Sequence, residues 1–300
     1  MSTEPQNHIV DINAWVERAK HDPQLYFERQ ATEIVLASIG GSSSFGGKMF
    51  LKGGTLMGVV YASPRQTVDI DFTANFDPTA SLLKELQKDL NGEMKRAAAR
   101  LGYPDVACQM QRLKKKPRPQ GFEKKRFPAI EMRIGYARRN TRQHERLADG
   151  QAANTLKVEV SFKEPVEAVE LVRLGEGSQI HVYAFAELIS EKMRALLQQE
   201  KRGRTGRNRC QDVYDIAYLV RSGKLQEEER RYILERLVKK SRARDIDPDI
   251  NSMSNPNIRA RAKEGWETLL LELTELPDFD TEFDDVEAFY KSLPWSSLAS

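Results

Sequence analysis

The stretch LKGGTLMGVVYASPRQTVDIDF, residues 51–72, carries two aspartates two positions apart in an otherwise apolar segment. Alternate residues of a β-strand lie on the same face. We therefore expect Val68 and the alternate apolar residues after it to face a core, with Asp69 and Asp71 on the other side. Two carboxylates this close repel one another unless a cation or a proton lies between them. Mg²⁺ suits such a pair, because it binds a couple of carboxylates together with substrate phosphates. The alternative is an edge strand whose acids simply face water.

The turn before this strand favours a nucleotide site. Gly53 and Gly54 separate a short strand from a predicted helix, and glycines let a phosphate approach the backbone closely. Thr55 is expected to act as the helix N-cap or as a phosphate ligand, and Lys52 adds a positive charge before the turn. An ordinary glycine turn with a threonine cap is the alternative. A phosphate cradle beside a metal pair accounts for both motifs at once.

A second predicted strand, residues 154–162, has the same alternation. Its apolar residues share one face, and Lys157, Glu159 and Ser161 share the other. Glu159 is a candidate third carboxylate of a metal site, or a base that accepts a proton from an attacking hydroxyl. The alternative is a surface lysine–glutamate pair on a half-exposed strand.

Two charged residues fall within the apolar arcs of predicted helices. Lys192 lies among the apolar positions of the helix 185–200, and Asp212 lies among those of the helix 210–223. Lysine and aspartate are seldom buried without a partner. One interpretation is a buried Lys192–Asp212 ion pair. The functional interpretation is that Lys192 holds a triphosphate and Asp212 orients it or an acceptor.

The chain changes character near residue 184. The part before it, residues 1–183, alternates predicted helices and strands, and the part after it, residues 184–300, is predicted to be helical with an acidic tail. The sequence thus predicts an α+β protein with a mixed sheet and helices first and an all-helical half second. Helices are expected at residues 12–20, 25–39, 55–62, 81–102, 185–200, 210–223, 227–240 and 257–273, and strands at 48–53, 67–74, 129–138, 154–162 and 180–185, with a basic loop before residue 129 and a short helix or loop at 277–295.

Composition excludes several classes of protein. Of the 300 residues, 40% are hydrophobic and 30% are charged, and no window approaches the ~18 consecutive apolar residues of a membrane span. No secretory signal is visible at the N-terminus. Two cysteines without close partners indicate neither a zinc site nor a disulfide framework. We expect a cytoplasmic protein without membrane association.

The net charge of +3 conceals a basic chain with an acidic end. Acidic residues crowd residues 273–300, whereas lysine and arginine concentrate in the runs 112–126, 137–146 and 201–209. Each run alone is as consistent with a solvated surface as with a binding site. Three of them in one chain favour a polyanionic partner such as RNA.

These motifs together resemble the AbiEii/AbiGii-type nucleotidyltransferase toxins. The first motif of that family is a Lys-Gly-Gly-Thr turn followed by Pro-Arg-x-Ser-x-Asp-x-Asp, and a Lys-x-Asp strand and a helical motif with Lys and Arg-Asp-x-Tyr-Asp-Leu come later. The matching residues are Lys52, Gly53, Gly54, Thr55, Arg65, Asp69, Asp71, Lys192, Asp212, Tyr214 and Asp215; Thr67, Glu159 and Gln211 replace the usual Ser, Asp and Arg.

The resemblance implies a polymerase-β-like nucleotidyltransferase fold and a requirement for an NTP with Mg²⁺ or Mn²⁺. It also implies the toxin of a toxin–antitoxin or phage-abortive-infection pair, with a cognate antitoxin that acts with or without direct contact. Several relatives add nucleotides to the 3′ end of tRNA. By carry-over, Asp69 and Asp71 are metal ligands, and Lys52, Gly53, Gly54, Thr55, Arg65 and Thr67 bind the nucleotide.

The sequence therefore predicts a metal-dependent nucleotidyltransferase acting on an RNA acceptor such as the tRNA 3′ end. Its catalytic residues are expected to be Asp69, Asp71, Glu159, Lys192 and Asp212, with Glu159 or Asp212 as the base. The competing hypothesis is a non-catalytic RNA- or partner-binding module on the same fold, in which the acids make ion pairs.

Overall fold

The computed structural model describes residues 9–117, 120–174, 178–201, 208–223 and 225–298. By contacts the chain forms two compact units. Unit 1 comprises the stretches 1–62, 67–164 and 169–182. Unit 2 comprises 63–66, 165–168 and 183–300, so two short segments from within the first part of the chain belong to the second unit.

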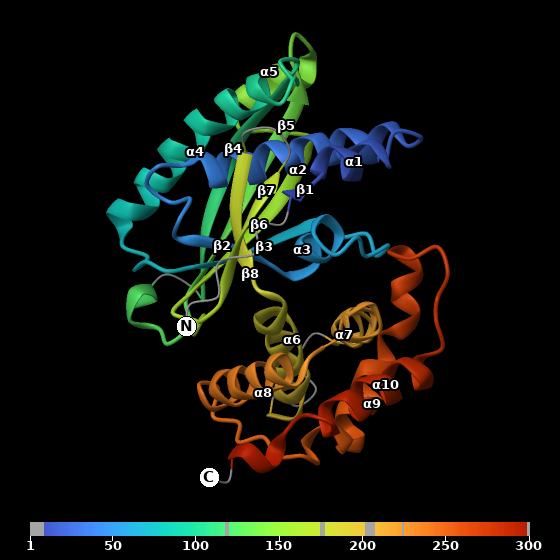
Figure 1. Cartoon of the computed structure of the whole chain (residues 1–300). Coiled ribbons are helices and arrows are strands. Elements are labelled where there is room, and N and C mark those ends of the chain that lie inside the picture. Colours follow the sequence, from blue (N-terminus) through green and yellow to red (C-terminus); the bar gives the residue numbers. More distant parts are fainter. Residues whose placement is uncertain (1–8, 118–119, 175–177, 202–207, 224, 299–300) are drawn as a thin grey trace. The chain divides into compact units, whose positions relative to one another are not determined.

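Unit 1 is built on one mixed eight-stranded sheet, drawn as arrows in Figure 1. The strand order is β1-β7-β8-β2-β3-β6-β5-β4. The strands are β1 (Ile9–Val10), β2 (Met49–Lys52), β3 (Asp69–Ala74), β4 (Val106–Lys116), β5 (Ala129–Arg138), β6 (Asn154–Phe162), β7 (Val169–Leu174) and β8 (Ser178–Tyr183). Strand β3 runs parallel to β6 and antiparallel to β2, so β3 lies in the interior of the sheet. Interior position excludes the edge-strand interpretation of the two aspartates.

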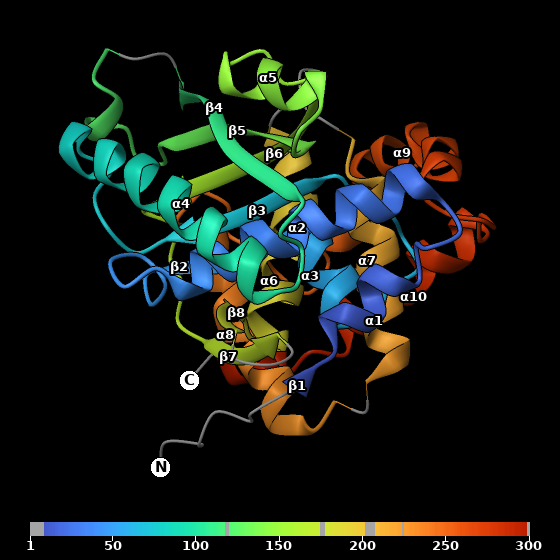
Figure 2. The same cartoon turned by 90° about the horizontal axis from the view of Figure 1, so that it is seen from above.

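Helices cover one face of this sheet. Helices α2 (Pro23–Gly41) and α4 (Ala80–Arg100) pack against each other and against β4, and Figures 1 and 2 show both on the same side of the strands. The apolar side chains of β3 and β6 turn toward this side, and Phe72 and Val160 are fully buried. The short helix α5 (Arg142–Ala148) lies on the opposite side in Figure 2.

Two local predictions for unit 1 are wrong. Val68 is 63% exposed, because β3 begins at Asp69 and Val68 precedes the strand pairing. The predicted basic loop before residue 129 contains β4, which lies at the edge of the sheet and pairs with β5. Lysines are common on edge strands, because their charge opposes pairing with another chain, and this is why a lysine-rich stretch can be a strand.

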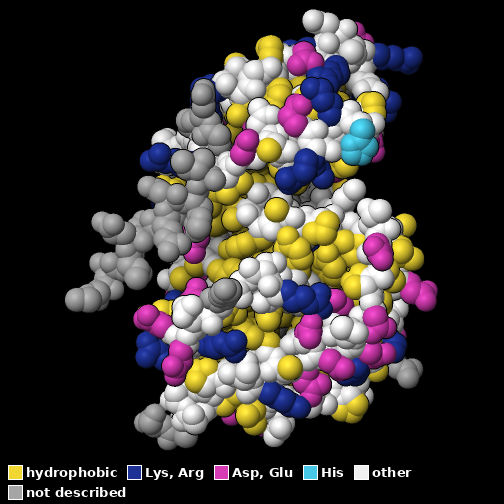
Figure 3. Space-filling model, turned by 45° about the vertical axis from the view of Figure 1, so that its right-hand side comes forward, with side chains coloured by type: hydrophobic (Ala, Val, Ile, Leu, Met, Phe, Trp, Pro, Cys, Tyr) yellow, Lys and Arg dark blue, Asp and Glu magenta, His cyan; other side chains and the backbone are white. Residues whose placement is uncertain are grey.

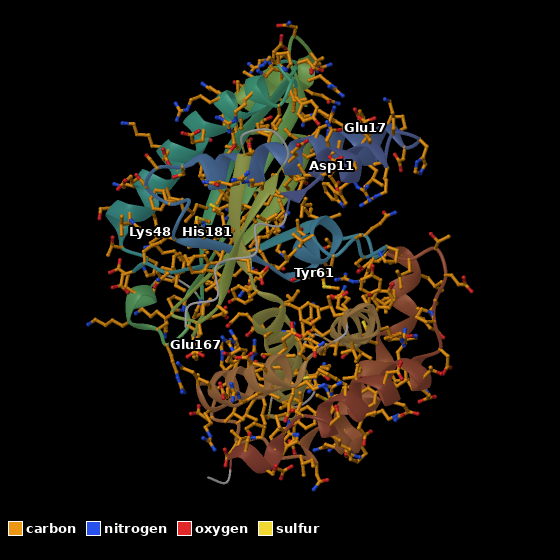
Figure 4. The ribbon with its side chains drawn as sticks, in the orientation of Figure 1. Asp11, Glu17, Lys48, Tyr61, Glu167 and His181 are labelled. Carbon is orange, nitrogen blue, oxygen red and sulfur yellow. The ribbon has the colours of Figure 1, made fainter. Side chains whose placement is uncertain are left out.

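The remaining elements of unit 1 are short. Helix α1 (Ile12–Glu17) follows Asp11, whose carboxylate accepts a hydrogen bond from the backbone N–H of Ala14, and Figure 4 shows Asp11 and Glu17 at this helix. Helix α3 (Gly53–Val59) lies in the connection between β2 and β3. The 3-10 helix η1 spans Phe122–Lys124.

Unit 2 is all-helical. Its helices are α6 (Phe185–Lys201), α7 (Cys210–Ser222), α8 (Glu227–Arg242), α9 (Pro256–Glu264) and α10 (Phe279–Lys291), with 3-10 turns η3 (Ser252–Ser254), η4 (Trp266–Leu271) and η5 (Trp295–Leu298). Helix α6 packs on α7 and α8, and α7 packs on α10. The predicted helix 257–273 is divided at Gly265, where an added Cβ would meet the Cβ of Asn208 at 3.1 Å.

The predicted class, a mixed sheet with helices followed by a helical part, is confirmed. None of the described helices is long and apolar enough to cross a membrane. Charged side chains of both signs are spread over the face drawn in Figure 3. Of the basic run 201–209, residues 202–207 lie outside the described part of the chain, as do residues 118–119 of the run 112–126.

Candidate active site

Two neighbouring rows of charged side chains cross the face of the sheet that α2 and α4 leave uncovered. Residues in register on adjacent strands share a face. Asp71 of β3 is in register with Glu159 of β6, which is in register with Glu131 of β5. We call these three residues the acidic row. The apolar residues that alternate with the acidic row are buried on the other face of the same strands; Ile70, for example, is 1% exposed. This burial fixes the face on which the acidic row lies.

The second row is mostly basic. Arg112 of β4 is in register with Arg133 of β5, and Arg133 with Lys157 of β6. We call these three residues the basic row. Lys157 is in turn in register with Asp69 of β3, and its Nζ lies 2.5 Å from the Asp69 carboxylate. The predicted residues Asp69, Asp71 and Glu159 are thus brought together on adjacent strands.

The environment of Asp71 disfavours a lone negative charge. Burial, more than any other cause, raises its pKa above the ordinary value. Lys52 opposes this rise, whereas the carboxylates of Glu159 and Asp69 add to it. A divalent cation would relieve both the desolvation and the crowding of like charges.

Lys116, which sequence analysis did not single out, neutralises the far end of the acidic row. Its Nζ lies 2.7 Å from a carboxylate oxygen of Glu131 and 3.1 Å from one of Glu159. The hydrogen bond from Lys116 is the main cause that lowers the pKa of Glu131. Because Lys116 and Arg133 both contact Glu131, the acid farthest from β3 is already compensated by cations.

The glycine turn lies directly against Asp71. Gly53 has a φ of +72°, and a Cβ there would lie 2.6 Å from Oδ2 of Asp71. Only glycine fits a left-handed backbone pressed against a carboxylate in this way. Helix α3 begins at Gly53, and Lys52 is its N-cap. The expectation that Thr55 caps this helix is therefore wrong: its hydroxyl instead donates to the backbone carbonyl of Asp69 at 2.8 Å.

The other nucleotide-binding candidates have varied surroundings. Lys52 forms an ion pair with Glu164 at 2.5 Å, and Glu164 also accepts from the Thr73 hydroxyl. Gly54 is the second residue of α3 and is partly exposed, and Thr67 is half-buried before β3. Their roles stay predictions.

A separate group of buried charges lies within unit 2. Arg65, from the short segment 63–66, donates two hydrogen bonds to the Asp215 carboxylate, at 2.9 and 2.8 Å. Lys192 of α6 donates to the same residue at 2.6 Å and to Asp212 at 3.1 Å. Asp215 is fully buried and Lys192 is 5% exposed. The buried ion pair that the sequence allowed is present, with Asp215 as its centre.

The cations determine the protonation of this group. Burial alone would raise the pKa of Asp215, but the charges of Lys192 and Arg65 and their hydrogen bonds lower it. Burial likewise opposes the charge of Lys192, and the two aspartates outweigh it, so the pKa of Lys192 is raised. All three side chains are therefore charged at neutral pH.

Glu272 completes the surroundings of Arg65. It accepts from Nη1 of Arg65 at 2.5 Å and from the Gln211 side chain at 2.7 Å, and its carbonyl accepts from the backbone N–H of Gln66. Gln211 thus stabilises the same acid that Arg65 contacts. A nucleotide role for Arg65, Lys192 and Asp212 would have to compete with these contacts.

The residues of the sheet fit a divalent cation by their chemistry. Asp69 and Asp71 offer hard oxygen ligands on one face, and burial, which raises the pKa of Asp71, disfavours its negative charge. Among the described residues, no group of three or more His, Cys, Asp and Glu side chains is arranged to hold a metal. A metal held here would thus rely on two carboxylates together with substrate oxygens.

Comparisons with known proteins identify the family of the chain and structures with a similar fold. The family model described as nucleotidyl transferase AbiEii toxin, type IV TA system, matches residues 35–289. The solved structure of MenT4, a nucleotidyltransferase toxin from Mycobacterium tuberculosis H37Rv, is similar in fold, with 16% identity, a TM-score of 0.59, and coverage of 96% of this chain and 92% of that one. JHP933 from Helicobacter pylori has 16% identity and a TM-score of 0.48, with coverage of 93% and 97%. No curated protein matches the chain.

Proposed function

We propose that this chain, which belongs to the family of AbiEii nucleotidyl transferase toxins of type IV toxin–antitoxin systems, transfers a nucleoside monophosphate from an NTP to the 3′ end of an RNA, with tRNA as the expected acceptor. Mg²⁺ or Mn²⁺ is the proposed cofactor. We propose that the protein acts in the cytoplasm, where NTPs and RNA are present together.

The observation that carries this proposal is the acidic row. Asp71 and Glu159 are in register on parallel neighbouring strands, and Asp69 lies on the same face. The raised pKa of Asp71 supports a site that is incomplete without a cation. An ordinary ion-paired surface would give each carboxylate its own lysine, as Lys157 does for Asp69.

The residues on this face of the sheet have separate proposed tasks. Asp69 and Asp71 would hold the metal, which would neutralise charge on the transferring phosphoryl group. Glu159 would accept the proton of the attacking hydroxyl, and Lys116 would hold Glu159 in place. The Gly53 backbone lies directly against Asp71. This contact supports the proposal that the nucleotide phosphates bind the backbone of the glycine turn, beside the metal ligands.

The experiment is incubation of the full chain with each labelled NTP, Mg²⁺ and total tRNA. We expect the wild-type chain to label RNA with at least one NTP, and Asp71→Asn to reduce labelling by 10²-fold or more, since electrostatic stabilisation of the transferring group is lost. Absence of labelling by the wild-type chain, or equal labelling by Asp71→Asn, would refute the proposal.

The second candidate is a non-catalytic RNA-binding module. It is favoured by the basic row, which suits phosphates without any chemistry. This candidate predicts RNA binding that survives in Asp69→Asn and Asp71→Asn, together with no NTP-dependent rise in melting temperature. The family's description as a type IV toxin–antitoxin system implies an antitoxin as a partner. We propose that the antitoxin opposes the transfer activity, with or without direct contact.

A further inference from the structure

The basic row has an arrangement that is costly without an anion. Arg112 and Arg133 are directly opposite across β4 and β5, and Arg133 and Lys157 are directly opposite across β5 and β6. Like charges directly opposite on neighbouring strands destabilise a sheet. Three consecutive strands therefore present cations that repel one another on an open face.

The partners of these cations leave positive charge unsatisfied. The Arg133 side chain is 44% exposed and contacts Glu131, which Lys116 also contacts. Arg112 is exposed and has no polar partner among the described residues, whereas Lys114, also exposed and on this face, is in register with Glu131. The positive charge thus increases from β6 toward the edge strand β4.

Protection of the sheet edge does not account for the row. Charged residues on β4 alone would serve to prevent pairing with another chain. Arg133, however, lies on β5, and Lys157 on β6, and both strands are paired on both sides. Cations on interior strands point to a ligand that lies across the sheet.

The row also leads to the acidic site. It is adjacent to the acidic row on the same face, and the Lys157 end contacts Asp69. From Lys157 to Arg112 the row crosses two strand spacings, or about 10 Å. The basic row is therefore longer than the phosphates of one nucleotide bound at Asp69 would need. Its length suits the sugar–phosphate backbone of a nucleic-acid strand whose terminus reaches β3.

We infer that the basic row binds the sugar–phosphate backbone of the single-stranded 3′ end of the RNA acceptor and guides its terminal hydroxyl toward Glu159. This inference rests on the proposed function. Metal binding by Asp69 would release Lys157 from its ion pair and make its ammonium available to a phosphate. Sequence-independent phosphate contacts of this kind position the acceptor and select single strands that can lie flat on the sheet.

The test is binding of a fluorescent single-stranded oligoribonucleotide to the full chain at several salt concentrations. The variant is Arg112→Gln/Arg133→Gln. The matched control is Lys84→Gln/Lys88→Gln, which removes the same charge from exposed positions of α4, on the opposite face of the sheet. Single-stranded contacts contribute about 0.7 each to the slope of log affinity against log salt, so we expect the variant's slope to be shallower by about 1.4 and the control's slope to be unchanged.

A second readout separates this inference from the proposed function. The rise in melting temperature with Mg²⁺ and NTP should be the same in the wild-type chain and in Arg112→Gln/Arg133→Gln. Equal RNA slopes for the two double variants, loss of the NTP response in the row variant, or no RNA binding by the wild-type chain would each overturn the inference. If RNA binding depends on the row while no NTP response exists in any variant, the binding of RNA by the row stands, whereas the proposed catalysis and the guidance of the hydroxyl toward Glu159 fail.

Discussion

Replacement of Asp215 by alanine tests whether the charges buried in unit 2 are a structural network. Asp215 is fully buried and accepts hydrogen bonds from both Arg65 and Lys192. Its removal would leave two cations with side chains only 5% and 6% exposed without their shared partner. Loss of one member of a buried ion pair costs about 3–5 kcal/mol, which corresponds to a fall in melting temperature of about 6 to 20 °C for a domain of ordinary size.

Two further variants serve as controls for Asp215→Ala. Lys192→Met should cost less than Asp215→Ala, because Asp215 keeps both hydrogen bonds from Arg65. Asp285→Ala removes a carboxylate from an ion pair with Arg221 in which both side chains are nearly half-exposed, so it should cost at most about 1 kcal/mol.

The assay is urea denaturation of the full chain, followed by circular dichroism and by tryptophan fluorescence. Trp266, which is buried, and Trp295 both lie in unit 2 and report on its unfolding. If Asp215→Ala destabilises unit 2 no more than Asp285→Ala does, the network does not hold this unit together.

Three further outcomes are expected. Gly53→Ala should lower the stability by about 1–2 kcal/mol, because its backbone is left-handed. The same variant should reduce the labelling of RNA, because the added Cβ would displace Asp71. Gly102→Ala is the control: with a φ of +77° and open space around it, it should show the stability loss alone. The stabilisation from Asp215, whose folded pKa lies below the ordinary 3.8, should be fully present above that value and be lost as the pH falls below it, so that a denaturation series from pH 7 to pH 3 is flatter for Asp215→Asn. Lys116→Met should cost less than about 1 kcal/mol, because its side chain is 42% exposed, and a larger loss in denaturation experiments would contradict a solvent-screened contact.

Sequence alternation predicted the strands of the site because each strand buries only one face. Ile70 and Phe72 alternate with Asp69 and Asp71, and that period of two is local information. The register between strands is not local. Nothing in the chain near Asp71 indicates that Glu159 lies opposite it, because the pairing of β3 with β6 depends on the packing of the whole sheet.

The network of unit 2 was visible only in part. Lys192 and Asp212 interrupt apolar helical arcs, and this pattern predicts a buried ion pair or a functional role. Periodicity does not predict the central position of Asp215, since this residue lies at the margin of its arc. Its partner Arg65 lies in an irregular segment where no periodicity applies. Glu272 follows a 3-10 turn and gave no signal for the same reason.

The basic run before residue 129 is rich in lysine, which predicts a loop. Its strand β4 becomes intelligible only with its partner, since Arg112 faces Arg133 in register. The sequence indicated a polyanionic partner, and the structure places part of this run on the face that carries the acidic row. Composition alone could not distinguish it from the run 137–146, which forms the end of β5 and helix α5.

The central claim is that Asp69 and Asp71 bind a divalent cation together with an NTP. Calorimetric titration of each NTP into the full chain, with Mg²⁺ and again with EDTA, measures this directly. The account predicts binding of at least one NTP that requires Mg²⁺ and is lost in Asp71→Asn, while Lys84→Gln/Lys88→Gln binds as the wild-type chain does. Binding of the same strength in EDTA, or in Asp71→Asn, would contradict it.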